Sequence, residues 1–169
     1  MALVDHLMLL LLFVVQPVQG AYAYRRYVAR IEAGEPPDVL RQYRITMLVE
    51  WLAFAALMIA WLVLGRPVAA LGFVTPGGTG FYIGLLLLAA MTAYLVFAWR
   101  KAAAATAEDR AKFKASLGNL RYFMPDNRRS YATFVRLSVT AGIVEEALYR
   151  GFVFWYLGQF MPAWAVVVV

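Results

Sequence analysis

Residues 45–64 read ITMLVEWLAFAALMIAWLVL and contain a single charged side chain, Glu50. A helix of about 20 mostly apolar residues is long enough to cross a hydrocarbon core of roughly 30 Å. Gly65, Arg66 and Pro67 follow directly, and glycine and proline commonly end helices. The stretch therefore predicts a transmembrane helix.

The whole chain has the composition of a membrane protein. Of its 169 residues, 63% are hydrophobic and 15% are charged, whereas soluble domains are about 45–50% apolar and about 25% charged. We therefore predict an all-α, polytopic transmembrane helical bundle that forms a single membrane-embedded domain over residues 1–169. The chain has no cysteine, which excludes disulfide bonds and thiolate metal sites.

Other apolar stretches are also long enough to be a span, or to be the start of one. We predict four full spans and the start of a fifth, at residues 3–22, 45–64, 81–99, 131–157 and 163–169. The first stretch also resembles a secretory signal peptide, with Ala21-Tyr22-Ala23 as the cleavage site. However, its start has no Lys or Arg and contains Asp5, which favours a retained span.

Two segments rich in Arg and Lys, residues 25–44 and 100–130, alternate with an almost uncharged loop. The positive-inside bias predicts that both segments are cytoplasmic and that the N-terminus is outside, in a multi-pass protein of a plasma membrane. Apolar side chains at helical spacing predict an amphipathic helix at the lipid interface over about residues 102–123. The expected partner is the lipid bilayer rather than nucleic acid, because no base-stacking platform or nucleic-acid motif accompanies the charge.

The predicted fourth span carries Glu145, Glu146 and Arg150 at membrane depth. Each such charge costs on the order of 2.5–3.5 kcal/mol, so the three residues need a compensating role. Glu146 and Arg150 are four residues apart, lie on one helical face and can pair. Glu145 is rotated by about 100° and shares a face with small residues, Ser138, Ala141 and Gly142, which favour the close approach of a second helix.

This arrangement has a catalytic and a structural interpretation. Two adjacent carboxylates in a low dielectric do not both ionise easily, so Glu145 is a candidate to accept a proton as a general base. In the alternative, Glu146 and Arg150 form an internal ion pair and Glu145 is simply protonated. Glu50 reads as a solvated helix end one turn inside its span, and His6 as an interfacial residue rather than a ligand.

The run Thr140-Ala141-Gly142-Ile143-Val144-Glu145-Glu146-Ala147-Leu148-Tyr149-Arg150-Gly151 resembles the first motif, Glu-Glu-x-x-x-Arg-Gly, of the CPBP family of CAAX prenyl proteases and bacteriocin-processing (Abi-type) proteins. The resemblance implies a bacterial inner-membrane endopeptidase in which Glu145 activates water and Glu146 and Arg150 support the site. It implies a membrane-associated protein or peptide precursor as substrate. We favour a metal-free mechanism without a cofactor, because carboxylates without histidine make a poor zinc site; the older family description leaves a divalent metal as the alternative.

The chain departs from the family in its histidines. Later family motifs place histidines in two further spans, whereas His6 is the single histidine here and matches neither. We therefore expect a C-terminally truncated fragment, the N-terminal part of such a protease, which by itself is incomplete for activity. The alternative is a non-catalytic membrane protein, such as an immunity or scaffold factor; a proton relay or transporter is a weaker third interpretation.

Overall fold

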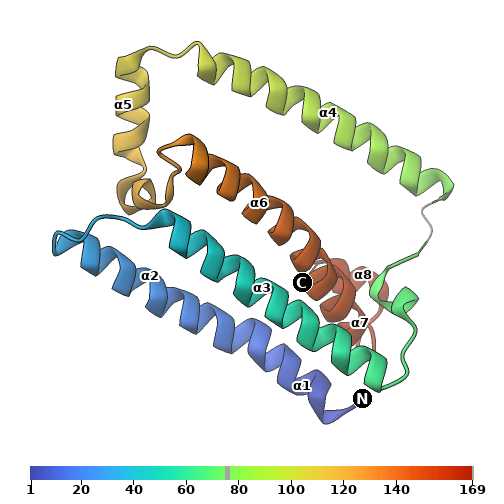
Figure 1. The fold of residues 1–169 in the computed structure, drawn as a ribbon. Coiled ribbons are helices and arrows are strands. Elements are labelled where there is room, and N and C mark those ends of the chain that lie inside the picture. Colours follow the sequence, from blue (N-terminus) through green and yellow to red (C-terminus); the bar gives the residue numbers. More distant parts are fainter. Residues whose placement is uncertain (75–76, 169) are drawn as a thin grey trace. The chain divides into compact units, whose positions relative to one another are not determined.

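The computed structural model describes residues 1–74 and 77–168, and these form helices and no strand (Figure 1). The predicted all-α fold class is confirmed. The α-helices are α1 (Leu3–Leu10), α2 (Gln16–Glu32), α3 (Val39–Val63), α4 (Gly78–Ala103), α5 (Ala107–Ser116), α6 (Arg128–Glu145), α7 (Phe154–Leu157) and α8 (Ala163–Val168). Two π-helices, η1 (Leu11–Val15) and η4 (Glu146–Val153), and two 3₁₀-helices, η2 (Val68–Leu71) and η3 (Gly118–Phe123), complete the order.

Among the described residues, three helices are long and apolar enough to cross a membrane: Leu3–Glu32, Val39–Val63 and Gly78–Ala102. They contain the first three predicted spans except for Leu64, and each helix extends several residues beyond the apolar stretch at one end or both. Capping explains one of these ends, because the Asp38 side chain accepts a hydrogen bond from the Arg41 backbone N–H at 3.0 Å and starts α3 before the apolar run. Helix α3 ends just before Gly65, whose φ of 63° suits the left-handed position after a helix.

The predicted fourth span, 131–157, lies within a helical run that passes from α6 through η4 to α7. This run is not among the three apolar helices, because Arg136, Glu145, Glu146 and Arg150 interrupt its hydropathy. The part of the chain that the structure describes therefore has three candidate spans, as in a membrane protein, and a fourth crossing stays a prediction.

The chain divides into two compact units. Unit 1 contains residues 1–73 and 122–169, and unit 2 contains residues 74–121. In unit 2, α4 buries none of the apolar side chains of its spanning window, as expected of a helix whose neighbours are lipids. Thr106 caps the start of α5 by accepting the Asp109 backbone N–H at 3.1 Å, which separates α5 from α4. The single interfacial helix predicted over 102–123 is thus divided among the end of α4, α5 and η3, and η3 begins at Gly118, whose φ is 54°.

Unit 1 is a layer of long helices in which α3 lies between the α1–α2 helix and α6 (Figure 1). Helices α3 and α6 run in the same direction, and α2 runs opposite to them. The core contains Trp61, Phe152, Leu12, Leu57 and Val144, all less than 2% exposed. Burial of these side chains from four parts of the sequence fixes α1–η1, α3 and α6–η4 against one another.

Two tyrosine hydroxyls tie the segment before α6 to the α2–α3 hairpin. Tyr27 donates to the Tyr122 carbonyl at 3.3 Å, and Tyr43 donates to the Phe123 carbonyl. Phe123 also stacks on Tyr24, with ring centroids 5.5 Å apart. These contacts set the position from which α6 starts, and therefore the register of α6 against α3.

Candidate functional site

The Glu-Glu-x-x-x-Arg-Gly element lies where the helix changes type. Helix α6 ends at Glu145, and the π-helix η4 runs from Glu146 to Val153. A π-helical turn is wider than an α-helical turn, and such turns are frequent at functional sites. The local backbone therefore differs from the regular helix that the sequence alone predicts.

Glu145 and Glu146 face different cavities, as their helical spacing predicts. Glu145 lines a cavity of about 260 Å³ between α2, α3 and the α6–η4 helix. Glu146 accepts a hydrogen bond from Arg150 at 3.1 Å, and this pair lines a second cavity of about 290 Å³ beside η2. The predicted Glu146–Arg150 pair is formed, and it leaves Glu145 without that partner.

The cavity at Glu145 has a polar lining that the sequence reading missed. Each of the three helices contributes side chains able to hydrogen-bond, from α2 (Gln16, Gln19), α3 (Gln42, Thr46, Glu50) and α6–η4 (Glu145, Tyr149). Tyr149 also packs edge-on against Phe13, with ring centroids 6.2 Å apart. The glutamines gave a signal in the sequence, because Gln16 and Gln19 are uncharged polar residues within the first apolar stretch.

Glu50 requires a correction to the sequence reading. Because α3 starts at Val39, Glu50 stands near the middle of the helix and is not a solvated end. It lines the same cavity as Glu145, and its Oε2 atom is buried without a hydrogen-bond partner among the described residues. The cavity thus holds two carboxylates from two helices, and like charges at close range repel more strongly as water is excluded.

The small-residue face near Glu145 is open, contrary to the expected close helix approach. A Cβ added to Gly142 would meet nothing within 4 Å, and Ser138 is exposed. Helix α6 instead buries Thr140 and Val144, on the face that packs toward α3. The buried face of α6 is therefore the one that packs against α3, and the small residues of α6 did not predict it.

The close approach occurs at Gly151, the last residue of the motif. A Cβ added there would lie 2.9 Å from the Leu71 carbonyl oxygen and 3.4 Å from the Leu71 Cβ. Real Cβ atoms do not approach a backbone atom so closely. Gly151 is therefore needed so that η2 can pack against η4 beside the Glu146–Arg150 pair.

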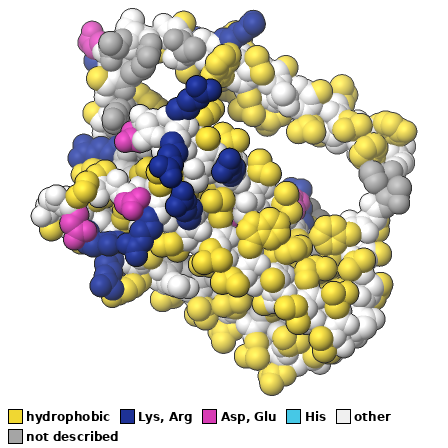
Figure 2. All heavy atoms as spheres, in the orientation of Figure 1, with side chains coloured by type: hydrophobic (Ala, Val, Ile, Leu, Met, Phe, Trp, Pro, Cys, Tyr) yellow, Lys and Arg dark blue, Asp and Glu magenta, His cyan; other side chains and the backbone are white. Residues whose placement is uncertain are grey.

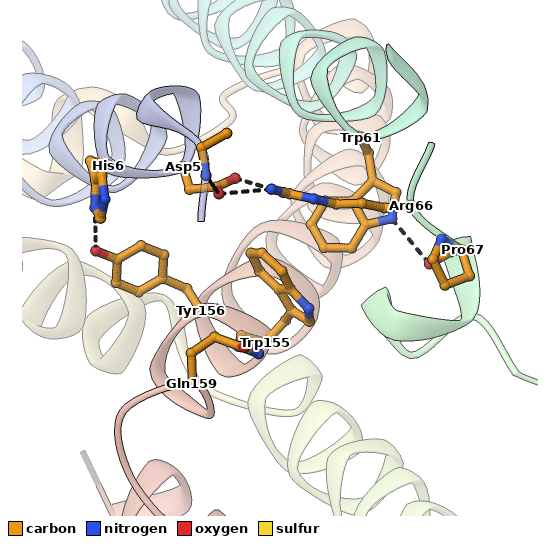
Figure 3. A network of polar contacts seen from close by, with 9 residues as sticks. Asp5, His6, Trp61, Arg66, Pro67, Trp155, Tyr156 and Gln159 are labelled. Carbon is orange, nitrogen blue, oxygen red and sulfur yellow. Dashed lines mark hydrogen bonds and ion pairs between the residues drawn. The ribbon is translucent and has the colours of Figure 1, made fainter. Parts of the chain in front are cut away.

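A second polar cluster lies where α1, the end of α3 and α7 meet (Figure 3). Arg66 donates to both carboxylate oxygens of Asp5, at 2.6 and 2.8 Å, and Asp5 is only 2% exposed. The Arg66 guanidinium lies over the rings of Trp61 and Trp155, 5.0 and 4.5 Å from their centroids. The hydrogen bonds to Asp5 raise the pKa of Arg66 above its ordinary value, so the guanidinium stays charged.

The only histidine of the sequence belongs to this cluster rather than to the carboxylate cavity. A hydrogen bond of 2.6 Å joins His6 Nδ1 to the Tyr156 hydroxyl, and the two rings meet edge-on. Trp61 Nε1 donates to the Pro67 carbonyl at 3.1 Å and holds the chain as it leaves α3. The cluster therefore joins the start of the chain to residues that lie far along the sequence.

The carboxylate cavity offers little for a metal. Glu50 and Glu145 supply two carboxylates, and within the described residues no group of three His, Cys, Asp or Glu side chains is close enough to hold an ion.

No family model, no curated protein and no solved structure matches this chain. The family resemblance of residues 140–151 therefore stays a prediction from the sequence.

Proposed function

We propose that this chain is the water-activating part of a CAAX-protease-like intramembrane endopeptidase, with Glu145 as the general base. The observation that supports the proposal is the separation of the two adjacent glutamates. Glu146 is paired with Arg150, whereas Glu145 lines a polar cavity and has no ion pair among the described residues. A base must be unpaired and must have room for water beside it.

In the proposed reaction, a water molecule in the cavity loses a proton to the Glu145 carboxylate. Its oxygen then bonds to the carbonyl carbon of the scissile peptide in a membrane-associated protein or peptide precursor. The carbon–nitrogen bond breaks, and the proton passes from Glu145 to the leaving amine. The hydrogen-bond donors that line this cavity and would be available to the developing oxyanion are the side chains of Gln16, Gln19, Gln42, Thr46 and Tyr149.

The proposed setting is a bacterial inner membrane, with α6, η4 and α7 as a fourth span. The N-terminus would be outside, and the basic segments 25–44 and 100–130 would be cytoplasmic. The Glu146–Arg150 pair, with side chains 58% and 72% exposed in the isolated chain, supports a further covering by lipid or protein. No cofactor or metal ion takes part in the proposed reaction.

The test is Glu145→Gln in the complete reading frame that contains these residues, reconstituted into liposomes. The probes are two internally quenched peptides of one sequence, with and without a farnesylated CAAX end. Loss of a general base lowers the rate by about 10²–10⁴-fold, so Glu145→Gln should abolish most of the cleavage. Glu32→Gln, which makes the same chemical change at an exposed position on α2, is the control and should cleave normally.

Cleavage by Glu145→Gln at the normal rate would disprove the general-base role. The second candidate is a non-catalytic membrane protein, and the single histidine favours it, because His6 is engaged with Tyr156 and not with the cavity. That candidate predicts that the unaltered chain cleaves neither peptide, with Glu145→Gln indistinguishable from it.

A further inference from the structure

A cavity of about 420 Å³ opens in unit 1 at the end where α3 and α6 begin. Its charged lining consists of three arginines, Arg41 and Arg44 on α3 and Arg129 on α6, against the single carboxylate of Asp38. All three arginines are exposed. Within the described residues, none of their guanidinium groups has a hydrogen bond or an ion pair.

The charge balance at this cavity favours an anion. One Asp38 oxygen accepts the Arg41 backbone N–H at 3.0 Å, so this carboxylate caps the N-terminus of α3. Helices α3 and α6 both start here, and the N-terminal end of a helix carries partial positive charge. Three unpaired guanidiniums and two helix ends thus converge on one hollow.

The remaining wall of the cavity is apolar. It contains Leu40, Ile45 and Leu48, and the last two are 43% and 60% exposed. Ile45 and Leu48 belong to the candidate span Val39–Val63, and they follow the arginines along α3. Figure 2 shows the same order along the hairpin, with basic side chains (dark blue) toward the α2–α3 turn and hydrophobic side chains (yellow) along the rest of it.

We propose that this cavity binds an anionic phospholipid. The arginines would hold the phosphate headgroup, and an acyl chain would lie along Ile45 and Leu48. Arginine suits this ligand because its planar guanidinium donates two parallel hydrogen bonds to a phosphate. A free phosphate ion would use the guanidiniums but not the apolar wall, whereas a lipid uses both. Basic pockets at the cytoplasmic ends of membrane helices recognise anionic headgroups in this manner.

The test uses the full chain in nanodiscs that contain phosphatidylcholine and phosphatidylglycerol, followed by native mass spectrometry of the retained lipid. The double variant Arg44→Gln with Arg129→Gln removes two of the three guanidiniums. At about five-fold per arginine, it should weaken the preference for phosphatidylglycerol by about 25-fold. Arg25→Gln with Arg26→Gln removes the same charge from exposed positions on α2 outside the cavity, and should leave the preference within about two-fold.

Equal weakening by the two double variants would overturn the proposal, because it would mean a diffuse attraction to basic residues. Equal retention of both lipids by the unaltered chain would also overturn it. A third arm adds inorganic phosphate to the chain in nanodiscs of phosphatidylcholine alone. Stabilisation against heat by inorganic phosphate as large as that by phosphatidylglycerol would identify a free anion as the ligand. None of these outcomes depends on catalysis by Glu145.

Discussion

Breaking the Asp5–Arg66 pair should strongly destabilise unit 1. The two side chains are only 3% and 17% exposed, and both carboxylate oxygens are bonded to the guanidinium. Removal of one partner of a buried pair leaves the other charge uncompensated and costs about 3–5 kcal/mol. Asp5→Ala leaves Arg66 with some access to water, so we expect the lower end, about 3 kcal/mol.

Arg66→Ala should be the more damaging of the two single changes. It leaves the more deeply buried carboxylate unpaired and also removes the cation–π contacts with Trp61 and Trp155, each of about 0.5–1 kcal/mol. We therefore expect about 4–5 kcal/mol in total. The double variant should lose much less than the sum of the two, with a coupling energy of about 2–3 kcal/mol.

The assay is unfolding of the purified chain in mixed micelles of increasing sodium dodecyl sulfate, followed by far-ultraviolet circular dichroism. The matched control is the exposed Glu108–Lys112 pair on α5, whose nitrogen–oxygen distance of 2.7 Å is just as short. Its coupling should be only about 0.3–0.5 kcal/mol, because water screens it. A coupling at Asp5–Arg66 no larger than that of the control would refute the argument that burial makes this pair strong.

Two other changes test the contacts around the motif. Gly151→Ala should destabilise the chain by about 1–3 kcal/mol in the same assay, because its Cβ would press on the Leu71 carbonyl; Gly142→Ala, with open space around it, should be neutral or stabilising by up to about 1 kcal/mol, and equal effects would contradict the close approach. Glu50→Gln should raise stability by about 1 kcal/mol, because it removes a charge whose Oε2 is buried without a partner, and a loss of stability would mean that the carboxylate is paired.

The sequence was sufficient to predict the membrane character of the protein and three of its long helices. An apolar run such as 45–64 can be solvated only by lipid, and in lipid the backbone must satisfy its own hydrogen bonds, so the run forms a helix wherever it packs. Helical geometry also separated Glu145 from Glu146, because the four-residue spacing between Glu146 and Arg150 is a local property of the chain. These conclusions needed no knowledge of neighbouring helices.

The partners of these residues were decided by tertiary structure. Glu50 shares a cavity with Glu145 only because α3 and α6 run side by side in the same direction, and His6 bonds Tyr156 only because α1 lies near α7. Hydrophobic periodicity gives the apolar side of a helix but not the helix that covers it. On α6 the small residues predicted a close approach at Gly142, and that side is open. The sequence by itself thus determined, among the described residues, three helices that are long and apolar enough to cross a membrane, and how the motif's charges divide. The packing of unit 1 determined what each charge faces, because burial beside a particular neighbour depends on contacts between residues far apart in the chain.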